Sequence, residues 1–476
     1  MKSLLIGNGI NIQFGGLAYT SKFILKRIKY KAKSGGYNKL FDGQLSKKDI
    51  VNVFEGFVDV SNDIIEGEYD SLIDNDDELE ALSDYKTRYG APYPAVCEPH
   101  EIMLEDWFFL IHLFFLKNTD IGESIESVKQ GFERLILDAI YNDGNLQLLH
   151  TKMNKKVKKF IKEYSNVFTL NYDNNIENLT QKDVFHLHGD YSVLHQSENP
   201  DYAQGFLRIN EGKSVIKDEF SHCYCNALLD YSGSLKLKRA TNNIRAINET
   251  IKLEDDIKAE RITKEEVLKA LSSNLDSRKM VQARFLNPTL KIATDYHFDK
   301  LRNIEGELHI IGMSPNNDDH IFNLINTNED ITKVIFYYYS KDNEEYIHNT
   351  FDKNIYMCKD IRMLWSDLGV KHKRFHCNYN IEEKLERFYD SINAMSDDVI
   401  TKEEIIKEVN SIPRYEMTRL TKLVKELRAD VNGSNEKDLN GEKLLEDFSR
   451  ISYIALREGI SPSVLYVVVV MNWSQC

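Results

Sequence analysis

The chain contains few cysteines, and they are widely scattered. Six occur in 476 residues, at Cys97, Cys223, Cys225, Cys358, Cys377 and Cys476, and no two of them have CxxC spacing. This set excludes a disulfide scaffold and argues against a structural zinc site. We therefore expect a reduced, cytoplasmic protein with no bound metal.

The chain also lacks an excess of positive charge and any long apolar run. Its 61 Lys and Arg residues against 75 Asp and Glu residues give a formal net charge of −14. A field of this sign does not attract phosphate backbones, so we expect no direct nucleic-acid binding. The longest apolar run, 464–471, is far shorter than the ~20 residues that span a bilayer, and residues 1–6 are too short for a signal peptide. We expect a soluble protein with no membrane contact, and we interpret 464–471 as a buried strand.

The remaining composition is that of a large globular protein. Hydrophobic residues make up 42% of the chain and aromatic residues 11%, which is enough to bury a sizeable core. At a typical domain size of ~150 residues, this length suggests about three domains, or two with insertions.

Short apolar segments alternate with helix-like stretches along most of the chain. The predicted strands are 4–6, 167–170, 184–187, 308–311, 334–339 and 374–376. The predicted helical stretches are 17–33, 45–165 with an acidic break at 74–77 and a buried helix at 105–116, and 240–285. This alternation predicts an α/β fold: a Rossmann-like, mostly parallel sheet with large helical insertions. We expect a domain over 1–380, with a helical insertion at about 45–165, and a helical C-terminal module over 381–476.

Four polar or glycine-rich segments follow predicted strands. Ligands bind at the carboxyl ends of strands in such sheets, so these segments are expected to lie close together. The first, residues 7–11, reads Gly-Asn-Gly-Ile-Asn, and its glycines allow backbone N–H groups to approach a pyrophosphate. The third glycine of the GxGxxG pattern is replaced by Ile12, and a purely structural turn is an equal alternative.

The second segment, 169–173, reads Thr-Leu-Asn-Tyr-Asp. Asn171 and Asp173 lie two residues apart and can project to the same side, which suits a ligand bearing a carboxamide and hydroxyls. Ordinary turn chemistry is the alternative, because Asn and Asp often end strands.

The third segment, 186–190, reads His-Leu-His-Gly-Asp. His188 precedes a glycine that opens space for a ligand, so it is a candidate acid/base group or ribose-hydroxyl partner. A structural histidine is the alternative. His186 and His188 share a strand face, which makes a metal site conceivable, but no Cys or acidic residue with convincing ligand spacing accompanies them.

The fourth segment, 310–314, reads Ile-Ile-Gly-Met-Ser, and a Gly-x-Ser after a strand can place amides and a hydroxyl around phosphate or ribose. Asp318 and Asp319 follow it. At least one of them is expected to cap the helix that begins near His320, and the sequence leaves open which one faces the site.

In this order, the four segments resemble the motifs of the sirtuin superfamily, in its divergent bacterial form related to AbiH-like and defence-associated sirtuins. The resemblance covers roughly residues 1–370, with strong matches in about 30 of them. It implies that NAD+ is the substrate. The implied catalytic residues are Asn171 beside the nicotinamide ribose, Asp173 facing the carboxamide and His188 at the ribose hydroxyls. The implied binding residues are Gly7, Asn8, Gly9, Asn11, Gly189, Gly312 and Ser314.

The activity that this resemblance implies is cleavage of NAD+ to nicotinamide and ADP-ribose, in an abortive-infection response to phage. Sirtuin deacylases carry a four-cysteine zinc module after His-Gly, whereas this chain has a Cys-x-Cys pair at Cys223 and Cys225, which argues against deacylation. The family's Arg after the glycine loop also has no clear counterpart here. An unrestrained hydrolase would kill its host. We therefore expect control by homo-oligomer assembly, by a regulatory partner protein or by a phage-derived trigger, with 381–476 as a regulatory or assembly module or as a simple helical extension.

Three other functions remain open at this point. A non-catalytic module that senses NAD+ or ADP-ribose would keep the glycine loop but tolerate loss of Asn171 and His188. A sirtuin-type protein deacylase or ADP-ribosyltransferase would need an acceptor cleft. A metallohydrolase built on His186 and His188 is the most distant alternative.

Overall fold

The computed structural model describes most of the chain. The described residues are 1–73, 75–91, 93, 95–117, 125–194, 216–227, 233–288, 291, 293–315, 318–351, 355–370, 401–412, 452–453, 455–457, 459–462 and 464. The strand predicted at 374–376, most of the C-terminal module predicted over 381–476, and Cys377 and Cys476 lie outside them.

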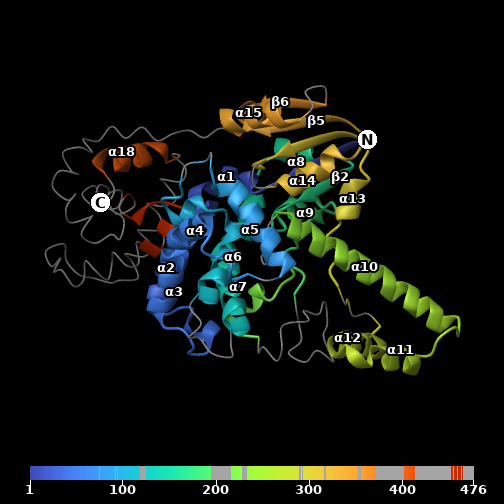
Figure 1. Cartoon of the computed structure of the whole chain (residues 1–476). Coiled ribbons are helices and arrows are strands. Elements are labelled where there is room, and N and C mark those ends of the chain that lie inside the picture. The colour runs from blue at the N-terminus through green and yellow to red at the C-terminus, as the bar shows by residue number, and fades with distance from the viewer. Residues whose placement is uncertain are drawn as a thin grey trace, which may run out of the picture.

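A six-stranded, all-parallel sheet forms the centre of the fold (Figure 1). The strands are β1 (Lys2–Ile6), β2 (Asn166–Thr169), β3 (Phe185–His186), β4 (Gly306–Ile311), β5 (Ile331–Tyr338) and β6 (Tyr356–Asp360). Their spatial order is β3-β2-β1-β4-β5-β6, which is the order of the dinucleotide-binding Rossmann fold. The predicted fold class is therefore confirmed.

Both faces of the sheet are covered, because successive side chains of a strand point in opposite directions. Leu4 and Ile6 of β1 pack in a core with helices α1 (Gly9–Gly15), α8 (Lys155–Lys162), α9 (Asn175–Thr180) and α16 (Ile361–Asp367). Leu5 packs in the opposite core with α13 (Phe298–Arg302), α14 (Asp319–Asn326) and α15 (Lys341–Thr350). Burial on both faces explains why the central strands are continuous apolar runs.

A separate helical core fills the long connection between β1 and β2. Its helices are η1 (Gly16–Tyr19), α2 (Ser21–Lys33), η2 (Asn38–Phe41), α3 (Lys47–Glu55), α4 (Phe57–Glu66), α5 (Asp76–Tyr89), η3 (Pro99–Glu101), α6 (Leu104–Lys117), α7 (Ile125–Tyr141) and η4 (Asn145–Lys152). The predicted buried helix at 105–116 is confirmed as α6, whose Trp107 is fully buried. The helical core begins earlier than the predicted 45, at η1 and α2, and α8 covers the sheet instead.

A second helical segment connects β3 to β4. It comprises η6 (Asp218–Cys223), α10 (Gly233–Lys258), α11 (Lys264–Ala270), η7 (Leu271–Ser273) and α12 (Leu275–Leu286), and α10 projects away from the sheet (Figure 1). This region agrees with the charged helical stretch predicted at 240–285.

The described part of the C-terminal region is helical and packs against the N-terminal helices. It contains α18 (Lys402–Ser411) and short helical pieces between 452 and 464. Arg27 of α2 donates a hydrogen bond to the carbonyl of Leu456, and Asn142 donates one to that of Arg457. Val464 is helical, which contradicts the strand predicted from that residue, and 465–471 lie outside the described residues.

Candidate functional site

β1 and β4 are the two central strands of the sheet, and the chain connections run in opposite directions from them. From β1 the sheet grows through β2 to β3, and from β4 it grows the other way through β5 to β6. The carboxyl ends of the strands at such a switch point leave a crevice between oppositely directed connections, and ligands of open α/β sheets bind there. The loops after β1 and β4 carry two of the four predicted segments.

The glycines of these two loops allow the loops to interlock. A Cβ atom on Gly9 would lie 2.5 Å from the Cα of Gly312, and one on Gly7 would lie 2.5 Å from the Gly312 carbonyl oxygen. The N–H of Gly9 donates to that oxygen at 2.8 Å, and the N–H of Gly7 donates to the carbonyl of Ile311 at 2.9 Å. Gly312 itself has a φ of 71°, which favours glycine. These two N–H groups are therefore engaged within the protein and are not available to a pyrophosphate.

A cavity of about 990 Å³ opens beside the interlocked loops. Its volume is at the upper end of the range for pockets that hold small molecules and cofactors. It is lined by seven of the ten predicted site residues, from three of the four segments: Gly7, Asn8, Gly9, Asn11, Asn171, Gly312 and Ser314. Among the described residues, the other three predicted site residues, Asp173, His188 and Gly189, do not line it.

Asn171 is held at the cavity wall by its neighbours. Its backbone N–H donates to the Thr169 hydroxyl at 3.1 Å, and its side-chain amide donates to the carbonyl of Gly7 at 3.3 Å. The side chain is buried, and it ties the end of β2 to the glycine loop after β1. These hydrogen bonds therefore fix the position of Asn171 within the protein itself.

Asp173 lies behind the cavity wall, where it orients Asn11. The Asn11 amide nitrogen donates to Asp173 Oδ2 at 2.7 Å, while the amide nitrogen of Asn175 donates to Oδ1 at 2.5 Å. Burial raises the pKa of Asp173, and these hydrogen bonds oppose the rise. Because Asp173 holds the nitrogen of the Asn11 amide, the Asn11 Oδ1 atom is left buried without a hydrogen-bond partner. Asp173 does not line the cavity and thus reaches it through Asn11, whose side-chain orientation it sets.

His186 and His188 differ sharply although they lie two residues apart. Nδ1 of His186 is 3.0 Å from the carbonyl of Asn171, and Nε2 is 2.5 Å from Glu177. Burial lowers the pKa of His186, but the hydrogen bond to Glu177 and its charge outweigh this effect, so the pKa is raised. Both ring nitrogens therefore face acceptors within the protein, which leaves no nitrogen for the metal site considered with His188.

His188 is fully enclosed, and its Nε2 has no hydrogen-bond partner. Its ring stacks against that of His320 on α14, with centroids 5.9 Å apart. Burial, together with the positive charges of Lys236 and His320, holds the pKa of His188 well below its ordinary value. The ring is therefore neutral near pH 7 and suits an acceptor or base rather than an acid.

The space beside Gly189 is filled by protein rather than left open for a ligand. The residue has a φ of 77°, and a Cβ atom there would lie 2.2 Å from the carbonyl oxygen of Asn226. The Asn226 side chain also accepts a hydrogen bond from the N–H of Asp190. The expectation that this glycine gives a ligand access is therefore wrong, because the segment after η6 occupies the position.

The cavity wall also contains Asp318, which the sequence analysis considered together with Asp319, and residues that no motif indicated. Glu105 of α6 and Asp318, which directly precedes α14, line it together with Ile412, Gly459 and Ile460 from the C-terminal region. Burial, reinforced by the charge of Glu105, raises the pKa of Asp318 well above its ordinary value. Asp319 instead accepts a hydrogen bond from the N–H of His320, so of these two aspartates it is Asp318 that lines the cavity. Glu105 and the three C-terminal residues lie far in sequence from all four motifs, so the motifs could not indicate them.

Comparison of the chain with protein-family models, with curated proteins and with solved structures gives no match. In the described part of the chain, no helix combines the length and the apolar character that crossing a membrane requires.

Proposed function

We propose that the protein is an NAD+ glycohydrolase of the sirtuin-like type. The observation that carries this proposal is the convergence of three separated segments on one cavity at the switch point of a Rossmann-type sheet. Dinucleotides bind at this place in folds with the same strand order. The resemblance of the motifs to those of defence-associated sirtuins supports hydrolysis of NAD+ in an abortive-infection response.

The polar groups at the cavity fit the chemistry of NAD+. The unpartnered Oδ1 of Asn11 is an acceptor for an amide or hydroxyl donor, and NAD+ presents both kinds of donor. In the proposed reaction, water adds to the ribose carbon as its bond to nicotinamide breaks, giving nicotinamide, ADP-ribose and a proton. The amide dipoles of Asn11 and Asn171 would stabilise the positive charge that develops on the ribose, because they are already oriented by protein hydrogen bonds.

One observation favours a second candidate, a module that binds NAD+ or ADP-ribose without turnover. His188, the proposed acid/base group, is absent from the cavity wall of the described structure. Hydrolysis then requires either a rearrangement that brings His188 to the substrate or activation of water by another group. A binding module requires neither.

The C-terminal region is the element that we propose holds the enzyme inactive. Ile412, Gly459 and Ile460 form part of the cavity wall, and Gly459 lies so close to Ala18 that a Cβ atom would be 1.9 Å from the Ala18 nitrogen. Displacement of this segment by a partner protein, a phage-derived trigger or homo-oligomer assembly would therefore change access to the cavity. Gly459→Val should raise basal hydrolysis several-fold. Unchanged or lower hydrolysis by the folded variant would contradict control by this segment.

The cellular test measures NAD+ after induction of the protein, with and without phage challenge. The wild type should deplete NAD+ on challenge, and Asn171→Ala should not. Asn178→Ala is the matched control, because Asn178 is an exposed residue of α9 and the same atoms are removed. NAD+ held constant in challenged wild-type cells, together with NAD+ binding by the purified protein, would favour the sensing module.

A further inference from the structure

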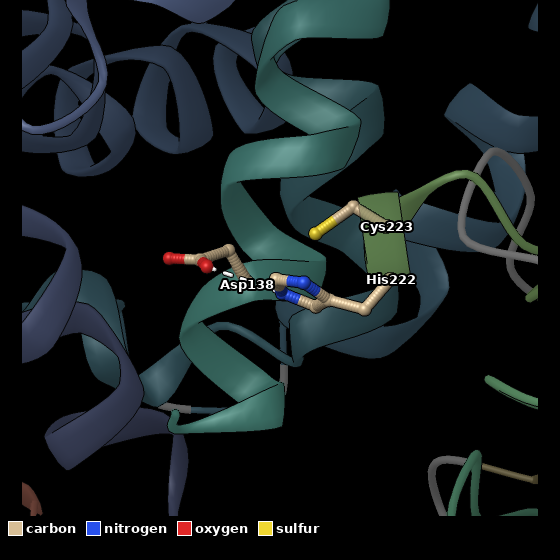
Figure 2. A group of neighbouring side chains, drawn as sticks. All are labelled: Asp138, His222 and Cys223. Carbon is tan, nitrogen blue, oxygen red and sulfur yellow. Dashed lines mark ion pairs between the residues drawn. The ribbon is translucent and has the colours of Figure 1, made fainter. Parts of the chain in front are cut away.

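A second group of chemistry-bearing side chains lies away from the cavity, where the helical core meets η6. Asp138 of α7 and His222 and Cys223 of η6 point toward one another (Figure 2). One donor atom from each residue lies within 4.8 Å of the donor atoms of the other two. Asp138 and Cys223 are buried, and His222 is partly exposed.

The separation between the nitrogen and oxygen donors of this group is that of two atoms that share an ion. Nε2 of His222 is 3.2 Å from Asp138 Oδ1, yet the buried Nε2 has no well-formed hydrogen bond. Two ligands on tetrahedral bonds of about 2.0–2.1 Å lie about 3.3 Å apart. The nitrogen and the oxygen therefore have the spacing of neighbouring ligands.

Other residues hold the ligands in place. The second oxygen of Asp138, Oδ2, accepts hydrogen bonds from Lys31 at 2.7 Å and from the Tyr37 hydroxyl at 3.0 Å, which leaves Oδ1 directed at His222. The His222 ring stacks on Tyr141 with centroids 4.3 Å apart. A carboxylate with one oxygen engaged by protein donors and a ring fixed by stacking are typical surroundings of metal ligands.

From this geometry we propose that Asp138, His222 and Cys223 bind one zinc ion, with water as the fourth ligand. One nitrogen, one sulfur and one oxygen donor within 4.8 Å of one another suit zinc among the common divalent ions. Thiolate and carboxylate together balance the charge of the ion. The partial exposure of His222 gives water a route to the remaining position.

The ion would link η6 to α7, and it would also stabilise the surroundings of His188. The chain runs directly from Cys223 to Asn226, whose backbone fills the space beside Gly189 and whose side chain accepts from Asp190. The zinc would therefore stabilise the segment that encloses the His188 loop. This role is structural and does not depend on the proposed hydrolysis.

The test uses the purified full-length protein without a histidine tag. Elemental analysis should give about one zinc per chain. After zinc is exchanged for cobalt, the protein should show the near-ultraviolet charge-transfer band of a thiolate bound to cobalt. Cys223→Ser should abolish the band, and Cys97→Ser, which alters an exposed free cysteine, should retain it.

Two further variants keep the test decisive if Cys223→Ser fails to fold. His222→Gln changes a partly exposed residue and should weaken cobalt binding about 100-fold or more. Tyr37→Phe removes one hydrogen bond to Asp138 Oδ2 and should weaken it about 10-fold. The proposal is overturned if the wild type binds neither zinc nor cobalt, if Cys223→Ser keeps the thiolate band, or if His222→Gln binds cobalt as tightly as the wild type.

Discussion

Two regions at the cavity differ in how their atoms are satisfied: the glycine loops after β1 and β4, and a group of buried polar side chains. On the β1 and β4 side, Gly7, Gly9 and Gly312 pack backbone against backbone, and the N–H groups of Gly7 and Gly9 are bound to protein carbonyls. On the other, polar side, two buried polar atoms have no hydrogen-bond partner: Asn11 Oδ1, whose residue lines the cavity, and His188 Nε2, whose residue lies outside the cavity wall. Packing alone explains the glycines. It does not explain unpartnered buried polar atoms, which carry a free-energy cost and point to a ligand or a reaction.

The largest expected effect is on the glycine side. In Gly9→Ala the new Cβ would lie 2.5 Å from the Gly312 Cα, and the backbone of two strands would have to separate. Overpacking of this kind costs about 3 kcal/mol or more. Gly43→Ala is the control, because Gly43 has a φ of 81° but open space around it, so the cost is about 1 kcal/mol of backbone strain. Thermal or urea unfolding should rank the two variants in this order, and equal losses would contradict the interlocking role.

The next effect is on the polar side and concerns activity. Asn11→Ala removes the unpartnered oxygen from the cavity, so NAD+ hydrolysis should fall about 100-fold in kcat/KM. Asn178→Ala should leave hydrolysis unchanged. The measurement is steady-state release of nicotinamide by variants whose circular dichroism matches the wild type. A folded Asn11→Ala variant of full activity would remove Asn11 from the site.

Asp173→Asn separates orientation from charge. The new side-chain amide can donate a hydrogen bond as well as accept one. The Asn11 side-chain amide can therefore flip, so that its oxygen accepts a hydrogen bond from the new amide and no longer faces the cavity. We expect little change in melting temperature but about 10-fold weaker NAD+ binding, which is the effect of one lost hydrogen bond. Isothermal titration calorimetry measures this directly. Unchanged affinity would show that Asp173 does not orient Asn11.

The smallest effects are on the pH dependence of stability. The pKa of His188 is lowered on folding, so its unfolded form takes up protons first and the protein loses stability as the pH falls below about 6.5. His188→Gln should flatten this loss by up to about 1.4 kcal/mol per pH unit.

The pKa of His186 is raised, so its contribution to stability is fully present below about pH 6.5 and disappears as the pH rises through its folded pKa. His186→Gln should therefore remove the loss of stability that this group causes as the pH rises above about 6.5, and it should leave the acid-side slope unchanged. Urea unfolding between pH 5 and 8 measures both slopes, and equal slopes for the two variants would contradict the assignment.

The sequence was sufficient for the strands that are continuous apolar runs, such as β1 and β5, because burial on both faces dictates their composition. It missed β6, whose residues Tyr356–Asp360 alternate between buried or half-buried and exposed positions at the edge of the sheet. The sequence also could not predict the order of the strands in the sheet, because parallel pairing joins segments that are far apart in the chain.

The candidate site was also predictable only in part. Motifs located Asn171 and the glycine loop at the cavity, because strand ends of a parallel sheet share one edge. They could not show that Asp173 acts through Asn11 or that Asn226 fills the space beside Gly189. Both facts depend on contacts between residues distant in sequence, and so does the meeting of Asp138 with His222 and Cys223.

The most direct test of the account is the reaction of purified full-length protein with NAD+. Binding is measured by calorimetry and turnover by nicotinamide release, for the wild type, Asn171→Ala and Asn178→Ala, each alone and with extract of phage-infected cells. The account predicts binding and triggered release of nicotinamide by the wild type and Asn178→Ala, and at least about 100-fold less release by Asn171→Ala. Absence of NAD+ binding by the wild type, or equal release by Asn171→Ala, would contradict it.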